Sequence, residues 1–159
     1  MPGRDYLLNL IEQAVQVIVR IAQLREDDKP DAALAEVVQA VKWLFGMPME
    51  EIGSLDADAL YAQLSDEEGP DVARDKCLAF AALAQQAGLS YEQKGLTALA
   101  QAAFHISLEF TLRGLSAAQS GIPPGLVPDV EALLAKLDGF ELSPRTRELL
   151  AKRAGGGAP

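Results

Sequence analysis

The chain has 159 residues and a formal net charge of −9, and 49% of its residues are hydrophobic while only 6% are aromatic. This length fits one domain, and the apolar content, carried by Ala and Leu, is too high for a disordered chain and favours helices. The acidic excess argues against binding to nucleic acid and to membrane surfaces, because both bind clustered basic side chains. We expect one helical domain over residues 1–154 and a flexible tail over residues 155–159.

The cysteine content and the N-terminal sequence bear on the compartment of the protein. Cys77 is the single cysteine, so neither an intramolecular disulfide nor a cysteine-based metal site is expected. The first residues lack the basic and then apolar pattern of a secretory signal. The most apolar stretch, residues 7–24, is interrupted by too many polar residues for a membrane-spanning helix. These features predict a cytoplasmic protein.

The first predicted helix covers about residues 5–25, with Asp5 as its N-cap. Its polar residues recur at intervals of three and four and form one narrow stripe: Asn9, Gln13, Gln16, Arg20 and Gln23. The rest of its surface is apolar, and a helix of this kind must be covered on more than one side. We therefore expect it either at the centre of the bundle or at a subunit interface.

Pro30 and Gly46 mark the ends of the second predicted helix, since proline favours the first helical turn and glycine the position after the last. Its core stripe consists of six apolar residues: Leu34, Val37, Val38, Val41, Leu44 and Phe45. A short helix is expected over residues 47–52, and another follows Asp56 as its cap. The charged segment 65–70 ends in Gly-Pro, so we expect a loop that separates the N-terminal third from the rest.

The longest predicted helices follow this loop. An Ala-rich helix is expected over residues 71–87 and ends at Gly88, and Ser90 caps a longer helix over residues 91–118. In this longer helix one apolar stripe is expected to face the core: Leu99, Ala103, Ile106 and Phe110. A second apolar stripe is rotated well away from the first: Phe104, Leu108, Leu112 and Leu115.

Residues 120–125 are rich in proline and glycine and end the longer helix. Two shorter helices are expected over residues 128–137 and 144–154, and Ser143 is the expected N-cap of the second. No segment shows the pattern of a strand. The sequence therefore predicts an all-α fold, a helical bundle of stacked antiparallel helix pairs with about seven or eight helices.

Two sets of residues share a spacing of four and then three, with a small residue at each end: Ala33, Val37 and Ala40, and Gly95, Leu99 and Ala102. Small residues at this spacing let another helix approach closely. The pattern resembles the second helix of a tetratricopeptide repeat. The whole layout resembles an uncharacterised family of bacterial helical proteins, here through Asp5-Tyr6-Leu7-Leu8 and Ile11-Glu12-Gln13. Both resemblances imply stacked helix pairs, and neither brings a catalytic residue.

Few side chains offer chemistry. His105 is the single histidine, and Glu109 and Arg113 follow at intervals of four, which places all three on one side of a helix. A catalytic zinc usually has three protein ligands, and a ferritin-like site needs Glu-x-x-His, for which Ala102 is the wrong residue. The acidic residues gather at turns, where we expect them to act as helix caps or to face solvent. We therefore expect no cofactor, no metal site and no enzymatic activity.

Apolar residues outside the expected core are the main indication of function. The residues of the predicted interface are large and apolar: Trp43, Phe104, Leu108, Leu112 and Leu115. Because such anchors dominate binding at interfaces, we expect a protein-interaction or scaffolding module whose partner is a protein, including a second copy in a homodimer. Two alternatives stay open. In the first, the C-terminal helices cover these residues. In the second, the protein is a small-molecule-binding protein or an enzyme, with a pocket between helices near His105, Glu109 and Arg113.

Overall fold

A computed structural model describes residues 2–46, 51, 57–115 and 122–156 of the protein. These residues form seven α-helices and one 3-10 turn: α1 (Pro2–Glu26), α2 (Pro30–Phe45), α4 (Ala57–Glu68), α5 (Pro70–Gln93), α6 (Thr97–Leu115), η1 (Pro124–Leu126), α7 (Val130–Lys136) and α8 (Pro144–Gly156). The prediction of an all-α helical bundle is confirmed. The helix expected over residues 47–52, the cap at Asp56 and the end of the long helix at 116–118 lie outside the described residues.

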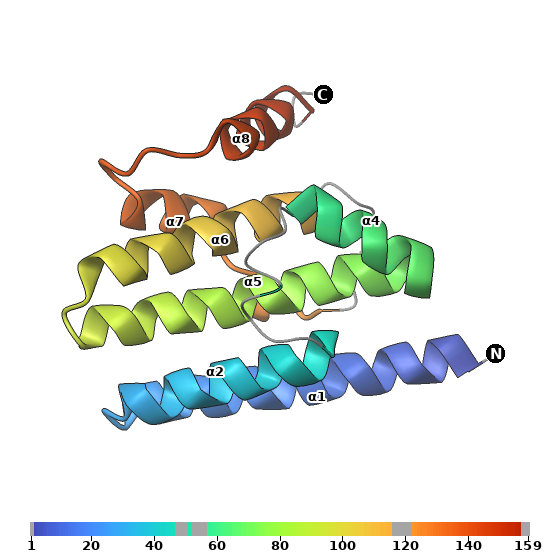
Figure 1. Ribbon diagram of the computed structural model, residues 1–159, viewed down its shortest axis with the longest axis horizontal. Helices are drawn as coiled ribbons and strands as arrows, with labels where there is room; N and C mark the ends of the chain where they lie inside the picture. Colours follow the sequence, from blue (N-terminus) through green and yellow to red (C-terminus); the bar gives the residue numbers. More distant parts are fainter. Residues whose placement is uncertain (1, 47–50, 52–56, 116–121, 157–159) are drawn as a thin grey trace.

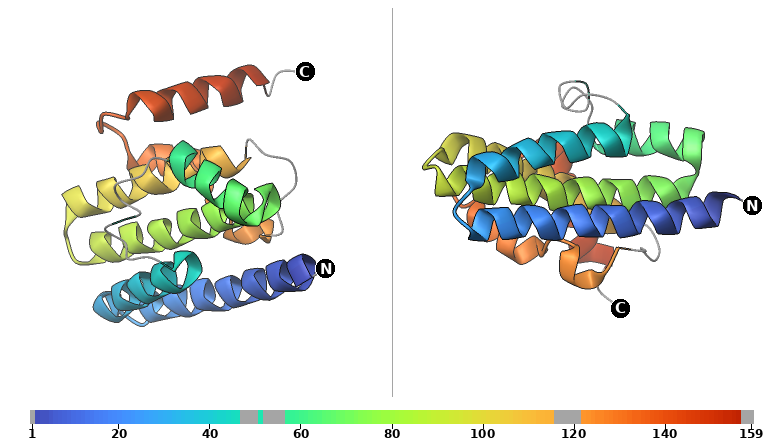
Figure 2. Two further views of the ribbon diagram at one scale, coloured as in Figure 1. Left: turned by 45° about the vertical axis from the view of Figure 1, so that its right-hand side comes forward. Right: turned by 90° about the horizontal axis from the view of Figure 1, so that it is seen from below.

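Helix α5 is the centre of the bundle, and every residue from 72 to 84 in it is buried. Helices α1 and α2 lie on one side of α5, while α6 lies on the other with α7 and α8 beyond it (Figure 1). The helices of each sequential pair α1–α2, α4–α5 and α5–α6 run in opposite directions and form a hairpin, as the two views in Figure 2 also show. Alanine is frequent in α5 because neighbouring helices approach it from several sides.

The core has two parts. The larger part surrounds α5, where Phe80 packs edge-on against Phe45 and Phe110 with ring centroids 5.4 and 4.7 Å apart. The smaller part lies between α6, α7 and α8 and is built around buried leucines, among them Leu108 and Leu133. The second part exists because α6 is apolar on more than one side, so it needs covering helices on both.

The assignment of the two stripes on α6 was wrong in most positions. Phe104, Leu108 and Leu112 are buried under α7 and α8, as the alternative of covering by the C-terminal helices predicted, so they do not form an exposed interface. Ala103 and Phe110 are buried as expected, but Leu99 and Ile106 remain 50% and 39% exposed. The spacing of apolar residues shows that a stripe exists; which helix covers it depends on the other helices. Of the remaining predicted interface residues, Trp43 and Leu115 are exposed.

Helix α1 is not central, although its sequence is apolar nearly all round. Its inner residues, such as Ile18 and Ile21, are buried, whereas Leu8 and Val19 on its outer surface are exposed. It begins at Pro2, so Asp5 lies inside the helix rather than at its N-cap. The N-terminal end of α1 extends beyond the end of α2 (Figure 2), which leaves that end of the helix with fewer neighbours.

The predicted ends of α4 and α5 and the predicted beginning of α6 also differ from the structure. Helix α4 continues through most of the segment 65–70, and only Gly69, with φ of 96°, separates it from α5. Helix α5 passes through Gly88 and Ser90, and the chain turns instead at Gly95, with φ of 75°. The Ser90 hydroxyl donates to the Gln86 carbonyl within α5, 2.9 Å away, and caps nothing.

Gly88 is inside a helix for a packing reason. A Cβ atom there would lie 2.5 Å from the ring of Phe104, so only glycine lets α6 approach α5 this closely. The end of α2 is as expected, because Gly46 adopts the left-handed conformation, with φ of 68°. Helix α8 extends to Gly156 and so includes the first two glycines of the predicted tail.

The two sets of small residues have different positions. Ala33, Val37 and Ala40 are buried on α2, as a seam between helices requires. Gly95 lies in the α5–α6 turn, and Leu99 and Ala102 are exposed, so the second set does not form a seam. The resemblance to tetratricopeptide repeats stays a prediction.

Replacing Gly88 with alanine is expected to destabilise the protein. Alanine is better than glycine in a helix interior by ~1 kcal/mol, but the clash with the buried Phe104 ring outweighs this gain. We expect the free energy of unfolding, measured by urea denaturation, to fall by about 1–3 kcal/mol. In the control, combining Gly88→Ala with Phe104→Leu should cost less than the sum of the two single changes. Additive losses would show that the two positions do not interact.

Candidate functional site

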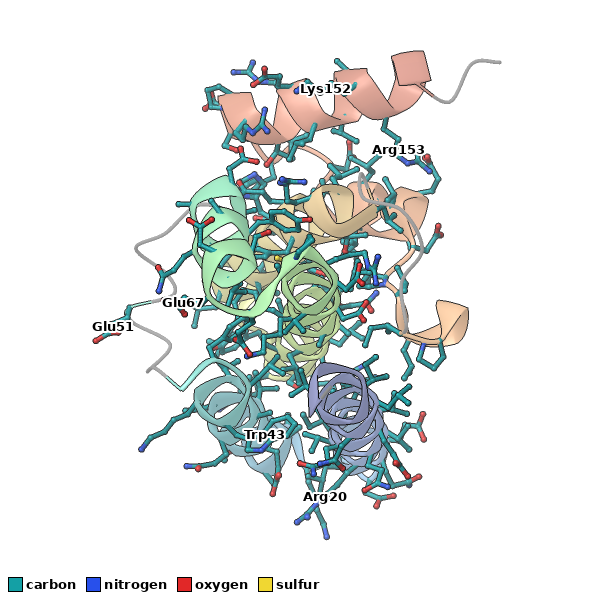
Figure 3. The ribbon with its side chains drawn as sticks, turned by 90° about the vertical axis from the view of Figure 1, so that its right-hand side faces the viewer. Arg20, Trp43, Glu51, Glu67, Lys152 and Arg153 are labelled. Atoms are coloured by element: carbon teal, nitrogen blue, oxygen red, sulfur yellow. The ribbon has the colours of Figure 1, made fainter. Side chains whose placement is uncertain are left out.

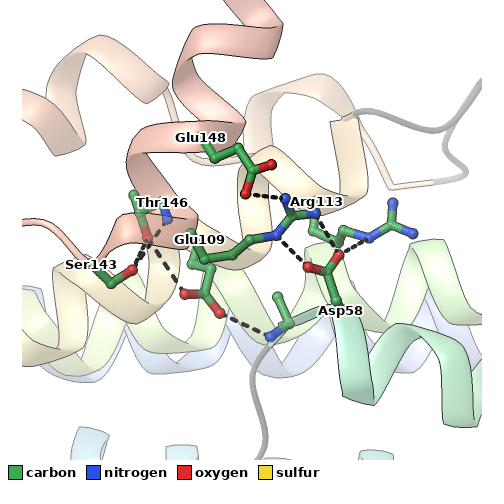
Figure 4. A network of polar contacts seen from close by, with 8 residues as sticks. Asp58, Glu109, Arg113, Ser143, Thr146 and Glu148 are labelled. Carbon is green, nitrogen blue, oxygen red and sulfur yellow. Dashed lines mark hydrogen bonds and ion pairs between the residues drawn. The ribbon is translucent and has the colours of Figure 1, made fainter.

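The three residues that the sequence placed on one side of α6 contact α4 or the beginning of α8, and Figure 4 shows two of them, Glu109 and Arg113. Glu109 accepts a hydrogen bond from the backbone N–H of Ala57, 2.8 Å from its Oε2 atom, and one from the hydroxyl of Thr146, 3.4 Å from Oε1. A carboxylate at the first N–H groups of a helix satisfies donors that have no partner within the helix. Glu109 therefore holds the beginning of α4 and the beginning of α8 against α6.

Asp58 is the second point of contact, and two arginines share it. Arg113 Nε lies 2.9 Å from one of its oxygens, and Arg145 on α8 donates two hydrogen bonds to the carboxylate, one of them 2.9 Å long. Arg145 also pairs with Glu148 at 2.9 Å, and the Arg113 guanidinium stacks over the Tyr61 ring, 3.9 Å from its centroid. The hydrogen bonds from Arg145 are the main reason why the pKa of Asp58 is lowered, with burial acting in the opposite direction.

His105 contacts the start of α8 through its ring. Its Nε2 atom accepts a hydrogen bond from the backbone N–H of Ser143, 3.2 Å away, and its ring centroid is 5.2 Å from that of Phe140. Partial burial lowers the pKa of His105 below the ordinary value of 6.5, and the nearby Glu109 carboxylate opposes this effect. Ser143 is the N-cap of α8, as predicted, because its Oγ atom accepts from the N–H of Thr146 at 3.2 Å.

His105, Glu109 and Arg113 are thus brought together, as the sequence indicated, but each is bonded to another part of the chain. The cluster of these three residues with Asp58, Arg145 and Thr146, called the polar cluster below, joins three helices. Within the described residues no group of three or more His, Cys, Asp and Glu side chains is placed to hold a metal ion. The arrangement favours a structural function for these side chains.

Helix α5 also contains a thiol and several buried charged side chains. Cys77 is buried, and burial raises the pKa of its thiol to about 12, so the thiol stays protonated at neutral pH. The buried Arg74 and Asp75 pair at 3.3 Å, and the buried Lys76 pairs with Glu68 at 2.7 Å. These charges are compensated where they are buried, as the cost of removing ions from water requires.

A groove between α2, α5 and α6 is the second candidate site, and it was not among the sites predicted from the sequence. Its volume is about 220 Å³, and eleven residues line it: Leu34, Val37, Val38, Phe80, Ala84, Ala87, Tyr91, Leu99, Ala102, Ala103 and Ile106. These lining residues include no charged side chain. This surface is called the α2–α5–α6 groove below. Part of it consists of the stripe on α6 that had been expected to lie inside the core.

The shape of the groove follows from side-chain size. The buried alanines Ala84, Ala87 and Ala103 form its floor, whereas larger side chains that are half exposed, such as Val38 on α2 and Leu99 on α6, flank it. Sequence contains a signal for it, since Leu99 and Ile106 form an apolar stripe separate from that of Phe104 and Leu108. The periodicity of the apolar residues does not indicate which of the two stripes remains exposed to solvent.

Comparison of the chain with models of protein families, with curated proteins and with solved structures finds no match in any of the three. Of the helices that the structure describes, none combines the length and the apolar content needed to cross a membrane. The indications of function are therefore those that the residues of this chain provide.

The stability of the protein is expected to depend on pH through His105. Its folded-state pKa is lowered, so below pH 6.5 the unfolded chain takes up a proton that the folded chain resists, and the free energy of unfolding decreases as the pH falls. The ring is partly exposed, so the slope stays well below the limit of ~1.4 kcal/mol per pH unit for one proton. Urea denaturation between pH 7.5 and pH 5.5, about one unit on either side of 6.5, measures it. Since the chain has one histidine, His105→Gln should flatten the profile; an unchanged slope would contradict the assignment.

Asp58→Ala is expected to weaken the attachment of α8 and to lower the free energy of unfolding by about 1–2 kcal/mol, because two arginines lose a shared, partly buried partner. The matched control is Glu131→Ala, which removes an exposed pair with Arg153 at 3.8 Å and should cost less than ~0.5 kcal/mol. Hydrogen exchange of the α8 amides should increase in the first variant only. Equal effects of the two changes would show that the polar cluster contributes no more than a surface ion pair.

Proposed function

We propose that this protein is a helical protein-interaction module, and that the α2–α5–α6 groove is its contact surface. The observation that carries the proposal is the exposure of several large apolar side chains along one groove: Val38, Leu99 and Ile106. Each Å² of apolar surface removed from water stabilises a complex by roughly 25 cal/mol, so covering this groove is favourable. Isolated exposed apolar residues are common, but a lined groove of them marks binding sites.

The size and chemistry of the groove favour protein side chains as ligands. Its volume of about 220 Å³ is below the roughly 300–1,000 Å³ of sites that enclose drug-sized molecules. An apolar cavity of ~150 Å³ holds a benzene-sized molecule, so this groove has room for a few aliphatic or aromatic side chains. The side chains suited to acid–base or metal chemistry lie in the polar cluster, where they bind other helices. These features support an interaction module over the alternative of a small-molecule site near His105.

Self-association is one form of the proposed function. The predicted dimer interface loses Phe104, Leu108 and Leu112 to the interior, while Trp43 and Leu115 remain exposed on separate helices. Trp43 lies beside Asn9, Leu10 and Gln13 of α1, at the opposite end of the molecule from Lys152 and Arg153 of α8 (Figure 3). For a homodimer, the α2–α5–α6 groove offers an apolar surface lined by three helices, which these two separate residues do not.

The proposal is tested with Val38→Asp/Leu99→Asp, which places two charges in the groove. These side chains are 47% and 50% exposed, so the fold should tolerate the change. The matched control is Leu8→Asp/Val19→Asp, whose side chains are 57% and 55% exposed on the outer surface of α1. Binding of the neutral apolar dye Nile red, followed by its emission, should weaken about tenfold in the first variant and stay nearly unchanged in the second.

Two further measurements complete this test. Circular dichroism of both variants reports whether they remain folded, and light scattering over a range of concentrations reports whether the wild-type chain self-associates. A mass that rises with concentration and falls only in the groove variant supports self-association through the groove. Dye binding that is equally strong in the groove variant and the control would overturn the proposal.

A further inference from the structure

The structure contains an example of a helix that covers the α5–α6 seam. Helix α4 lies over the end of α5 and α6 that is remote from the α5–α6 turn (Figure 1). It buries Ala57, Leu60 and Leu64, which follow one another at intervals of three and four and therefore lie on one side of the helix. One amphipathic helix with a small residue and two leucines is thus enough to cover this end of the seam.

The α2–α5–α6 groove lies on the part of α5 and α6 that is nearer the turn, where Tyr91 and Leu99 line it. On α5 it is lined from Phe80 to Tyr91, a distance of about 16 Å along the helix axis, which equals about three helical turns. The alanines between these two residues form a floor on which a helix can approach closely, as Ala and Gly allow elsewhere in the bundle. The dimensions therefore fit a helix of about three turns with its apolar side inward.

Charge distinguishes between possible partners. The lining side chains are uncharged, but the chain carries a net charge of −9, and Glu51 and Glu67 project on the side of the molecule where α2 and α4 lie (Figure 3). An acidic partner, including a second copy of this chain, is repelled by this charge, whereas a basic one is attracted. Lysines or arginines on the outer side of a bound helix also stay in water, so binding carries no desolvation cost for them.

Resting on the function proposed above, we propose that the α2–α5–α6 groove binds a basic amphipathic helix of another protein. The helix is about three turns long and presents small and aliphatic side chains at i, i+3 and i+7, the spacing with which α4 packs on the same seam. Its apolar side chains bind against the alanine floor between Val38 and Leu99.

The probe for this inference is a fluorescein-labelled synthetic peptide of about 14 residues, roughly four turns. It has Ala, Leu and Leu at i, i+3 and i+7 and Lys at the outer positions. Two control peptides have the same composition in scrambled order, or Glu in place of Lys. In fluorescence anisotropy at low ionic strength, both controls should bind the wild-type protein at least about tenfold more weakly than the probe.

Protein variants locate the binding surface. Val38→Asp/Leu99→Asp should weaken probe binding about tenfold, while Leu8→Asp/Val19→Asp, which adds the same two negative charges elsewhere, should leave it within about twofold. Because both variants change the net charge equally, a difference between them reports contact with the groove. Raising the ionic strength should weaken probe binding several-fold, since charges at the surface are screened by salt.

The outcomes separate this inference from the proposed function. If the Glu peptide binds as well as the Lys peptide, or if the scrambled peptide does, the inference of a basic amphipathic helix is wrong while the groove remains a binding surface. If no peptide binds and the wild-type chain dimerises through the groove, the occupant is a second copy and the inference is overturned. If Nile red binding does not depend on the groove, the proposed function itself fails.

Discussion

Helices α5 and α6 lie so close together that each presents a glycine to a large side chain of the other. Gly88 on α5 faces the ring of Phe104, and Gly114 on α6 faces the side chain of Leu78, where an added Cβ atom would in each case lie 2.5 Å away. This contact fixes the distance and the rotation of α6. All other helices that contact α6 are placed by that rotation, because it decides which of its sides faces α4, which faces α7 and α8, and which stays open.

The rotation of α6 about its axis determines which neighbours its polar side and its two apolar sides contact. The side with His105, Glu109 and Arg113 meets the first residues of α4 and α8, where His105 and Glu109 accept hydrogen bonds and Arg113 forms an ion pair with Asp58. Leu108 and Leu112 face the cluster with α7 and α8. The third side, with Leu99 and Ile106, meets no helix of the described chain closely enough to be covered.

The polar cluster also accounts for the position of the groove. Glu109 binds the N–H of Ala57, so α4 begins at this point of α6 and covers only the part of the α5–α6 seam that lies beyond it. The part towards the turn keeps its apolar residues exposed to solvent. An uncovered seam costs hydrophobic stabilisation in the isolated chain, and this surface is available to a partner.

The sequence by itself determined the helical class, the net charge and those helix ends that are set by a local signal. Pro30, Gly46 and Ser143 mark ends correctly, because a proline, a left-handed glycine and a capping hydroxyl act on backbone groups within a few residues. It also placed His105, Glu109 and Arg113 on one side of a helix. These features depend on residues that are neighbours in the chain.

Tertiary structure alone decided which apolar stripe is buried and which glycine ends a helix. Gly88 and Gly95 have the same local potential to stop a helix, yet Gly88 lies inside α5, where it makes room for the ring of Phe104, and Gly95 forms the turn. On α6, Leu108 and Leu99 are equally apolar, yet α7 and α8 cover the first and no described helix covers the second. Burial depends on contacts between residues that are far apart in the chain, and the periodicity of one helix carries no information about its neighbours.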